Sequence, residues 1–275
     1  MNSNPVCTLE ELIATVPDGA KIAVPADYSG VAMAATRALI RRGVRRLHLV
    51  CVPVGGMQTD MLIGARAVAT IETSAVTLGE FGAAPRFVEA IQHGAITLMD
   101  ATCPAIHAAL QATEKGLPFM ALRGLLGTDL LASRKDWKVI DNPFASGDRI
   151  VLIPAIKPDI ALFHAPLADR EGNVWIGRRR ELVAMAHASQ RTLVTVEEIS
   201  ETSLLADEKT AAGVIPALYV SAIARAKHGA WPVGLWDHYA ADQAALADYA
   251  VRARTQDGFQ SLLGGSFDHE AAAAE

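Results

Sequence analysis

Polar side chains that could bind or react with a ligand lie in four segments, each directly after a short apolar run. The first segment is residues 25–30, and it precedes a helical pattern whose free N–H groups could hold an anion. Ser29 is the candidate contact there, or else its hydroxyl caps the helix. The second segment, residues 54–60, contains Gly55 and Gly56. A glycine pair allows positive φ and close approach of the backbone to a ligand, or forms a tight turn.

Asp60 ends that second segment, where it either contacts a ligand or caps the following short helix. The third segment, residues 72–82, contains Glu80 between two glycines and among apolar side chains. Partial desolvation there would raise the pKa of this carboxyl group and suit it to proton transfer. Alternatively, Glu80 is a solvated acid at the positive end of the helix that begins near Pro85. In the fourth segment, Glu197 and Glu198 follow a strand, and we expect at most one of them to face a site.

The elements that must position these segments alternate between short β-branched strands and helices. The front of the chain favours strands at 21–26, 46–52, 67–72 and 95–99, with helices at 31–42, 60–63, 85–93 and 104–115. After a further strand at 117–122, residues 125–133 show little periodicity and are expected to form a loop. The middle then favours strands joined by turns, at 137–140, 149–153, 160–164 and 173–176, with turn residues at 169–172. A helix at 180–188, a strand at 191–196 and a helical stretch at 240–263 follow.

This order predicts an α/β fold built on an open, mostly parallel sheet with helices on both faces. A capping box over residues 8–11 indicates a further helix at the start. Because no repeat and no linker rich in Gly, Ser or Pro is present, residues 1–275 are interpreted as one domain. We expect a disordered tail over about residues 265–275.

Composition excludes several classes of function. The net charge of −5 argues against binding nucleic acid, which rests on concentrated positive charge. No apolar stretch is long enough to span a membrane and the start does not resemble a signal peptide, so we expect a cytoplasmic protein. The cysteine and histidine spacings predict neither a disulfide framework nor a metal site. Nucleotide P-loop, dinucleotide and nucleophile-elbow motifs are absent from the sequence.

An ordered set of short motifs resembles the alpha-type subunits of the family I coenzyme A (CoA) transferases, such as that of glutaconate CoA-transferase. The likeness covers nearly the whole chain, and each motif is weak alone but specific in this order. The matching stretches are residues 55–56 leading into 60–64, 115–119, 140–144, 158–165, 169–173, 194–199 and 234–237.

The resemblance implies the open α/β fold shared by CoA-transferases, ribose-5-phosphate isomerase and glucosamine-phosphate deaminase. It also implies a two-subunit enzyme that moves CoA from an acyl-CoA to a carboxylic acid through a glutamyl-CoA thioester. In this family the nucleophilic glutamate belongs to the beta-type subunit, and two alpha and two beta chains commonly form a heterotetramer. The CoA thioester would be a substrate, with no cofactor bound permanently. The alpha-type chain would bind the acid or acyl part.

Two details qualify the resemblance. Many alpha-type chains of the family have a Gly-Gly-Phe turn after the first strand, whereas this chain has residues 25–29. In addition, residues 79–87 look like a subgroup related to hydrolases that cleave steroid rings in CoA thioesters. In that subgroup a carboxylate of the alpha-type chain is thought to act, which implies a catalytic role for Glu80. Arg86 is then a candidate to hold Glu80 or a substrate carboxylate through a bidentate pair.

Three functions therefore stay open. The leading one is CoA transfer, with Arg86, Arg123 and the backbone of Gly55 and Gly56 as candidates to bind the acid. The second is a hydrolase that opens a ring or cleaves a CoA-linked substrate with Glu80 as general base. The third is a ligand-binding protein of the same fold without catalysis. Ser29, Asp60 and Glu197 complete the set of candidate binding residues.

Overall fold

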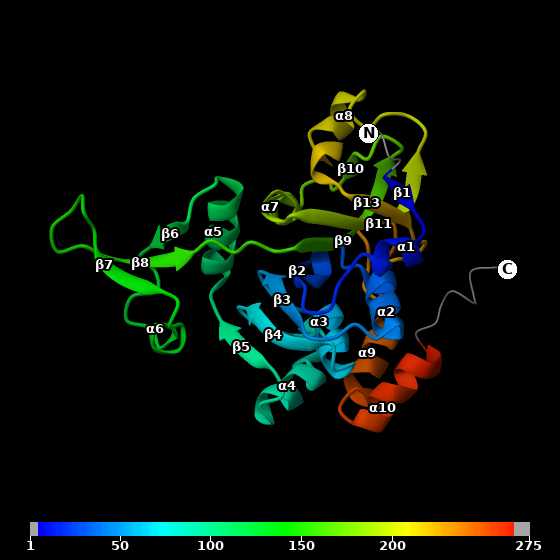
Figure 1. Ribbon diagram of the computed structural model, residues 1–275. Helices are drawn as coiled ribbons and strands as arrows, with labels where there is room; N and C mark the ends of the chain where they lie inside the picture. Colours follow the sequence, from blue (N-terminus) through cyan, green and yellow to red (C-terminus); the bar gives the residue numbers. More distant parts are fainter. Residues whose placement is uncertain (1–4, 267–275) are drawn as a thin grey trace.

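The computed structural model describes residues 5–266, and a mostly parallel sheet of ten strands forms the centre of this part of the chain (Figure 1). Eight of the strands follow one path, and every neighbouring pair along it is parallel. In sheet order they are β1 (Val6–Cys7), β13 (Ala222–Arg225), β11 (Arg191–Ser200), β9 (Ile160–Asp169), β2 (Lys21–Pro25), β3 (Leu47–Val52), β4 (Val68–Thr73) and β5 (Thr97–Asp100). The predicted open, mostly parallel sheet is confirmed.

Helices cover both faces of this sheet, as predicted. The helices whose buried side chains join the core on one face are α1 (Leu9–Ala14), α2 (Met33–Arg42), α3 (Met57–Gly64), α4 (Pro85–Gln92), α9 (Gln243–Arg252) and α10 (Gln256–Ser261). Those of the other face are α5 (Cys103–Glu114) and α7 (Arg180–Ala188). The predicted capping box is present, because Thr8 accepts the Glu11 backbone N–H and Glu11 accepts that of Thr8.

Residues in the central strands alternate between the two cores. In β2, Val24 belongs to the core on the side of α2 and α3, and Ala23 belongs to the core on the side of α5 and α7. Leu49 and Val50 of β3 divide in the same way. Because successive side chains of a strand point to opposite faces and both faces are covered, these strands are continuously apolar.

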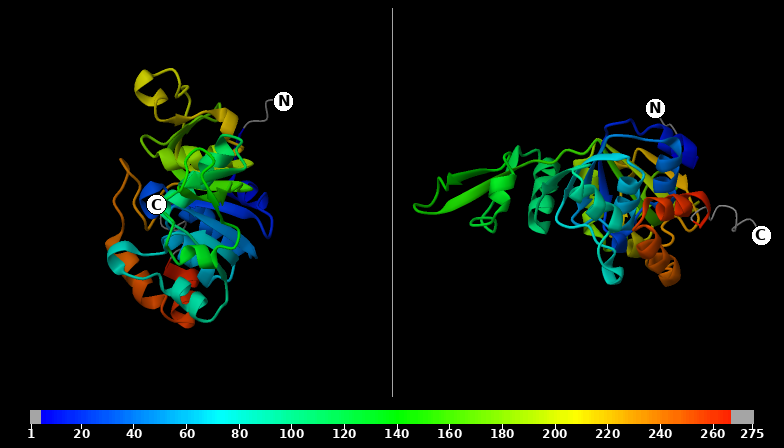
Figure 2. Two further views of the ribbon diagram at one scale, coloured as in Figure 1. Left: turned by 90° about the vertical axis from the view of Figure 1, so that its left-hand side faces the viewer. Right: turned by 90° about the horizontal axis from the view of Figure 1, so that it is seen from below.

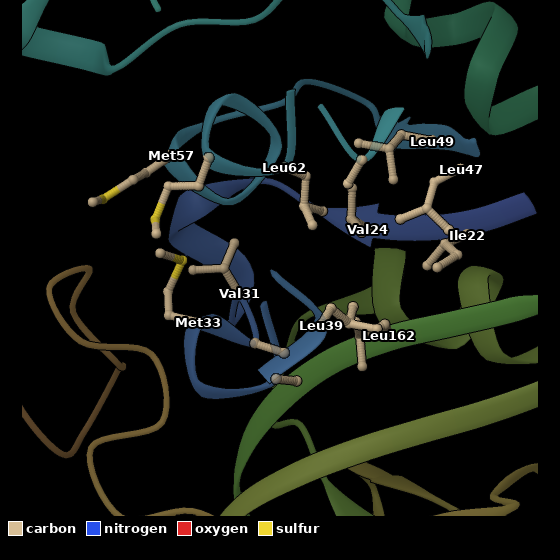
Figure 3. Close-up of a cluster of buried hydrophobic side chains, with 14 of the residues drawn as sticks. Ile22, Val24, Val31, Met33, Leu39, Leu47, Leu49, Met57, Leu62 and Leu162 are labelled. Carbon is tan, nitrogen blue, oxygen red and sulfur yellow. The ribbon is translucent and has the colours of Figure 1, made fainter. Parts of the chain in front are cut away.

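The core between the sheet and α3 is a dense cluster of aliphatic side chains. Figure 3 shows Ile22 and Val24 of β2, Leu49 of β3 and Leu62 of α3 in this cluster, and each is at most 1% exposed. Burying one such side chain stabilises the fold by about 1.5–3 kcal/mol. This packing fixes α3, and with it the loop that precedes α3, against the sheet.

The order in which successive strands are added to the sheet reverses between β2 and β9, although these two strands are parallel. Strands β3, β4 and β5 follow β2 toward one edge, whereas β11 and β13 follow β9 toward the other. In open parallel sheets, ligands bind outside the carboxyl ends of the strands near such a reversal. The fold therefore directs attention to the loops that follow β2, β3 and β4.

The middle of the chain forms a small antiparallel sheet that projects from the main body (Figures 1 and 2). Its strands in order are β6 (Phe119–Leu122), β8 (Arg149–Pro154) and β7 (Lys138–Asp141). The predicted loop at 125–133 was wrong in part, because Leu130–Ser133 form the short helix α6. Two further short strands, β10 (Val174–Trp175) and β12 (Val214–Ile215), pair antiparallel, and β10 also pairs with β9 across the predicted turn at 169–172. The short helix α8 (Glu208–Ala211) precedes β12.

The C-terminal part differs from the single helical stretch predicted at 240–263. It divides into α9 and α10, whose first turns are capped by the side chains of Asp242 and Thr255. A helical turn over Leu262–Ser266 follows, so the first residues of the disordered tail expected over about 265–275 belong to this turn, and residues 267–275 lie outside the described part. In the described residues, no helix has the length and apolarity needed to cross a membrane. The interpretation as one domain stays a prediction.

Candidate active site

A cavity of about 320 Å³ lies at the carboxyl ends of β2, β3 and β4. The loops after these strands contribute Asp27, the pair Gly55 and Gly56, and Leu78 to its lining, and α9 contributes Tyr249. Segments from both ends of the sequence thus build one site. Its size is at the lower end of the range for small-molecule sites. The structure brings two predicted binding residues, Gly55 and Gly56, to this cavity.

Asp27 is the one carboxylate that lines the cavity in the described residues. It lies in a turn of 3₁₀ helix over Asp27–Ser29, and its two carboxylate oxygens are 3.2 and 3.1 Å from the backbone nitrogen of Met57. Met57 is the first residue of α3, so the negative charge faces the positive end of that helix. The loop after β2 therefore places an acid in the site.

The carboxyl group of Asp27 has a raised pKa. Burial raises the pKa of Asp27 to about 6, against the opposing effect of the Met57 hydrogen bond and with support from the nearby charge of Asp60. Such a group can take up or release a proton near neutral pH. Asp27 was not among the candidate residues predicted from the sequence, although a polar residue directly after the strand at the reversal point was a usable signal.

Gly55 and Gly56 are needed for close packing. A Cβ atom at Gly56 would lie 2.2 Å from the Asp27 carboxylate, and one at Gly55 would lie 2.8 Å from Oγ1 of Thr59. The backbone of Gly56 has a φ of −129°, and neither glycine has positive φ. The positive φ that a glycine pair allows is therefore not used here, and the group that closely approaches the Gly56 backbone is the Asp27 carboxylate of the same chain.

Asp60 lies behind the cavity wall and does not line it. It is completely buried in α3, where it accepts the Phe87 backbone N–H at 2.7 Å and the Tyr249 hydroxyl at 2.8 Å. Burial raises the pKa of Asp60 to about 6, and these hydrogen bonds lower it. Asp60 thereby joins α3, α4 and α9, and it supports the Tyr249 ring that forms part of the lining.

Glu80 lies at the exposed tip of the loop between β4 and α4. Its neighbours Gly79 and Phe81 line the cavity, whereas the Glu80 side chain is exposed. A backbone hydrogen bond from Leu78 to Gly82 closes the loop at 2.9 Å. The partial desolvation expected for Glu80 is therefore absent from this chain alone. Its catalytic role stays a prediction.

Arg86 is buried in the first turn of α4. Its guanidinium is 2.5 Å from Glu89 and 3.3 Å from the Gln256 side chain, and only 3% of the residue is exposed. In the described chain, Arg86 forms no pair with Glu80 and does not line the cavity. The structure does not bring Arg86 to the place where it would hold a substrate carboxylate.

Ser29 is buried beside the cavity and does not cap a helix. Its hydroxyl donates to the carboxylate of Glu181 in α7, and the helix that follows begins at Met33 with Ala32 at its N-cap. The alternative interpretation of Ser29 as a helix cap was therefore wrong. The Ser29–Glu181 contact instead ties the loop after β2 to the other face of the sheet.

Glu197 is the acceptor of a buried hydrogen-bond network. It accepts from His164 Nε2 at 2.8 Å, from the Tyr239 hydroxyl at 2.8 Å, and from the backbone N–H groups of His228 and Gly229 at 2.7 and 3.0 Å. Burial raises its pKa, but these donors and the His164 ring outweigh burial and bring the pKa of Glu197 to about 2. Burial lowers the pKa of His164, which keeps this ring neutral at pH 7.

Glu197 also lies along a second, polar depression of about 310 Å³, separate from the first cavity. Glu198 also lines this depression, where its side chain is exposed, so the expectation that at most one of the two acids faces a site stays a prediction. Arg123 lies elsewhere, at the end of β6 on the projecting sheet, where it forms a pair with Asp148 at 2.6 Å. The structure does not bring Arg123 together with the other candidate residues. Within residues 5–266, no three His, Cys, Asp or Glu side chains gather as a metal-binding group.

Comparison with known proteins identifies the family. Residues 6–226 match the family model described as coenzyme A transferase. The chain belongs to the coenzyme A transferase family. This is an enzyme family that transfers CoA, and the resemblance drawn from the ordered motifs is confirmed. Because the match ends at residue 226, helix α9, which completes the cavity with Leu246 and Tyr249, lies outside it.

Two relatives of this CoA-transferase chain are 30% identical to it. The A subunit of glutaconate CoA-transferase from Acidaminococcus fermentans matches over 247 residues, which are 83% of this chain and 76% of the relative. The A subunit of 3-oxoadipate CoA-transferase from Pseudomonas knackmussii matches over 264 residues, which are 93% of this chain and 91% of the relative. The crystal structure of the Acidaminococcus enzyme matches with a TM-score of 0.86 at 28% identity, covering 94% of this chain and 87% of that chain.

A further relative has a hydrolase name. The cholesterol ring-cleaving hydrolase IpdA subunit of Rhodococcus jostii is 28% identical over 257 residues, which are 87% of this chain and 85% of the relative. Over most of its length, this chain is thus similar both to subunits of CoA-transferases and to a subunit of a hydrolase. The choice between the two reactions depends on the residues of the site.

Proposed function

We propose that this chain is the alpha-type subunit of a two-subunit CoA-transferase, with the nucleophilic glutamate in a beta-type partner. The observation that supports this most directly is the state of the carboxylates around the cavity. Asp27 is held by the Met57 N–H at the start of α3, and Glu80 points outward from the loop tip. Neither is arranged to attack a thioester bound in the cavity. The relatives are named as A subunits, which agrees with a partner chain.

The proposed reaction moves CoA between two carboxylic acids. The partner's glutamate attacks the acyl-CoA carbonyl, the C–S bond breaks, and an acyl-glutamyl anhydride and a CoA thiolate form. The thiolate then attacks the glutamyl carbonyl, which gives glutamyl-CoA and releases the first acid. The acceptor acid reverses these steps. In this sequence of steps the present chain holds the acyl group in its cavity, against Leu78, Phe81 and Tyr249.

The transfer reaction is tested with the chain co-purified with a beta-type subunit. Incubation with an acyl-CoA and a radiolabelled carboxylic acid should place the label in a CoA ester. Borohydride reduces a glutamyl-CoA thioester to an alcohol and hydroxylamine converts it to a hydroxamate, each with release of CoA, and mass spectrometry should find the glutamate modified in this way on the partner. An adduct on this chain, or release of free CoA with no need for an acceptor acid, would contradict the proposal.

A second candidate function is hydrolysis of a CoA-linked substrate with Glu80 as general base. The position of Glu80 between two cavity-lining residues favours this alternative, because a partner chain docked over the loop tip would desolvate its carboxylate. The IpdA name of one relative agrees with such a reaction.

Glu80→Gln separates the two reactions. General-base catalysis contributes about 10²- to 10⁴-fold, so a hydrolase should lose at least about 100-fold in kcat. A transferase with its nucleophile in the partner should lose far less. Glu10→Gln, in the exposed first turn of α1, is the matched control. If instead the chain binds a metabolite but never associates with a second subunit, the third hypothesis, a ligand-binding protein without catalysis, gains support.

A further inference from the structure

The residues that line the cavity are mostly apolar, and one of them is charged. Apart from Asp27, its lining is made of glycine, alanine, threonine, aliphatic and aromatic residues, which include Val54, Leu78, Phe81 and Leu246. None of its described lining residues is Lys, Arg or His. A ligand carboxylate that entered this cavity would therefore meet no cation.

Asp27 also occupies the helix N-terminus next to this lining, which is a place that would suit an anion. A helix N-terminus attracts negative charge because its first N–H groups are free and its dipole is positive there. Helix α3 begins with Met57, and both oxygens of Asp27 already lie within 3.2 Å of the Met57 nitrogen. Gly56 leaves room for this arrangement, since a Cβ atom there would overlap the carboxylate.

A second negative charge in the cavity would then be repelled by Asp27 at short range. Like charges placed together in a poorly solvated site are strongly unfavourable, and building in such a repulsion is an effective way to reject a wrong ligand. An uncharged acyl chain meets no such penalty and buries its surface against Leu78, Phe81 and Leu246.

We propose that Asp27 determines specificity in this chain: the cavity takes the short, uncharged acyl group of a monocarboxylic acid, and Asp27 rejects an acyl group with a second carboxylate. The proposal rests on the proposed function as the acyl-binding half of a CoA-transferase. The proposed preference for monocarboxylic acyl groups distinguishes this chain from two of its relatives, because glutaconate and 3-oxoadipate, which their names contain, are dicarboxylates.

The test compares two CoA esters with the same five-carbon chain, valeryl-CoA and glutaryl-CoA, which differ in a terminal methyl or carboxylate group. The purified two-subunit complex transfers CoA from each ester to acetate, and kcat/KM is measured for both. We expect valeryl-CoA to be preferred by at least about tenfold, which is about 1.4 kcal/mol. Equal use of the two esters, or a preference for glutaryl-CoA, would overturn the proposal.

Variants of Asp27 connect this preference to the residue. Asp27→Ala removes the charge and frees the α3 N-terminus, so the preference for valeryl-CoA should fall at least about tenfold. Asp27→Asn removes the charge but keeps the shape, and should reduce the preference by a smaller factor. Asp141→Asn, at the exposed end of β7, is the control and should leave the ratio unchanged. An unchanged ratio in both Asp27 variants would refute the role of Asp27.

A binding measurement keeps this inference separate from the proposed reaction. If the complex transfers CoA from neither ester, the proposed function fails, and the inference is then decided by isothermal titration calorimetry of both esters with the complex. The wild-type complex should bind valeryl-CoA at least about tenfold more tightly, and Asp27→Asn should narrow that gap. Equal dissociation constants for the two esters would refute the inference. If Asp27→Ala does not fold, the Asp27→Asn ratios decide.

Discussion

Oε1 of Glu197 lies 2.8 Å from Nε2 of His164, so a carboxylate at the carboxyl end of β11 holds an imidazole in the neighbouring strand β9. An ionised carboxylate accepts hydrogen bonds only, so Nε2 of His164 bears the proton and Nδ1 accepts from the Thr195 hydroxyl at 2.8 Å. The same carboxylate binds the backbone of His228 and Gly229. This network attaches the segment after β13 to the sheet.

Glu197→Gln should destabilise the fold at pH 7 by about 2–3 kcal/mol, because an amide cannot accept from all of these donors. The pKa of Glu197, about 2, is below its unfolded value. The contribution of Glu197 to the free energy of unfolding is therefore fully present above about pH 4.5 and is lost as the pH falls toward 2. Urea unfolding should show a smaller difference in unfolding free energy between wild type and Glu197→Gln at pH 3 than at pH 7. Glu198→Gln, the exposed neighbour, is the control, and a difference independent of pH would contradict this account.

Tyr249→Phe should destabilise the chain by about 1–3 kcal/mol at pH 8, because the buried Asp60 carboxylate loses a hydroxyl donor. The pKa of Asp60 is already raised to about 6, and losing this hydrogen bond raises it further. The variant then binds a proton more readily than wild type, so its deficit should shrink as the pH falls from 8 to 5. Unfolding curves at both pH values measure this, with Tyr219→Phe as the control. A larger deficit at pH 5 would contradict the prediction.

Arg134 fixes the base of the projecting sheet to the main body. Its guanidinium, 4% exposed, lies 2.7 Å from Glu72 of β4 and 2.8 Å from Asp136, and it stacks on Trp137. Arg134→Ala leaves the buried Glu72 carboxylate without this partner and should cost about 3–5 kcal/mol in unfolding free energy.

Two companion variants test the reason for that loss. Arg134→Met combined with Glu72→Gln removes both charges and should recover most of the stability, since replacing a buried pair costs less than breaking it. Arg123→Ala breaks only the exposed pair with Asp148 and should leave the unfolding midpoint unchanged. If the double variant loses as much unfolding free energy as Arg134→Ala, the loss comes from the missing packing on Trp137 and not from the unpaired carboxylate.

Local sequence patterns predicted most elements of this fold but few contacts of the site. The apolar strand at 21–26 and the helix at 31–42 were recognisable because both faces of the sheet are buried and because Gly43 ends the helix. The hydrogen bond from Arg86 to Gln256 could not be predicted, since no local pattern relates positions so distant in the chain.

Asp27 was missed for a similar reason. The role of Asp27 in the site depends on the position of the start of α3 beside the end of β2. The packing of α3 on the sheet determines that position. Glu80 was placed correctly in a loop among apolar residues, but whether its side chain points into the cavity or out of it could not be predicted from spacing. Long-range packing, which sequence periodicity does not encode, sets both of these features.

Gly56 and Asp27 should behave as a coupled pair. Gly56→Ala places a methyl group 2.2 Å from the Asp27 carboxylate and should destabilise the chain by about 1–3 kcal/mol through overpacking. Because the atoms that this methyl group would overlap belong to the Asp27 side chain, Asp27→Ala should remove most of this cost. A double-mutant cycle in urea should thus give a coupling energy of at least about 1 kcal/mol. Gly124→Ala, where a Cβ atom meets no neighbour within 4 Å, is the control. Additive effects of Gly56→Ala and Asp27→Ala would mean that the carboxylate does not occupy the start of α3 in solution, and the specificity assigned to Asp27 would lose its structural basis.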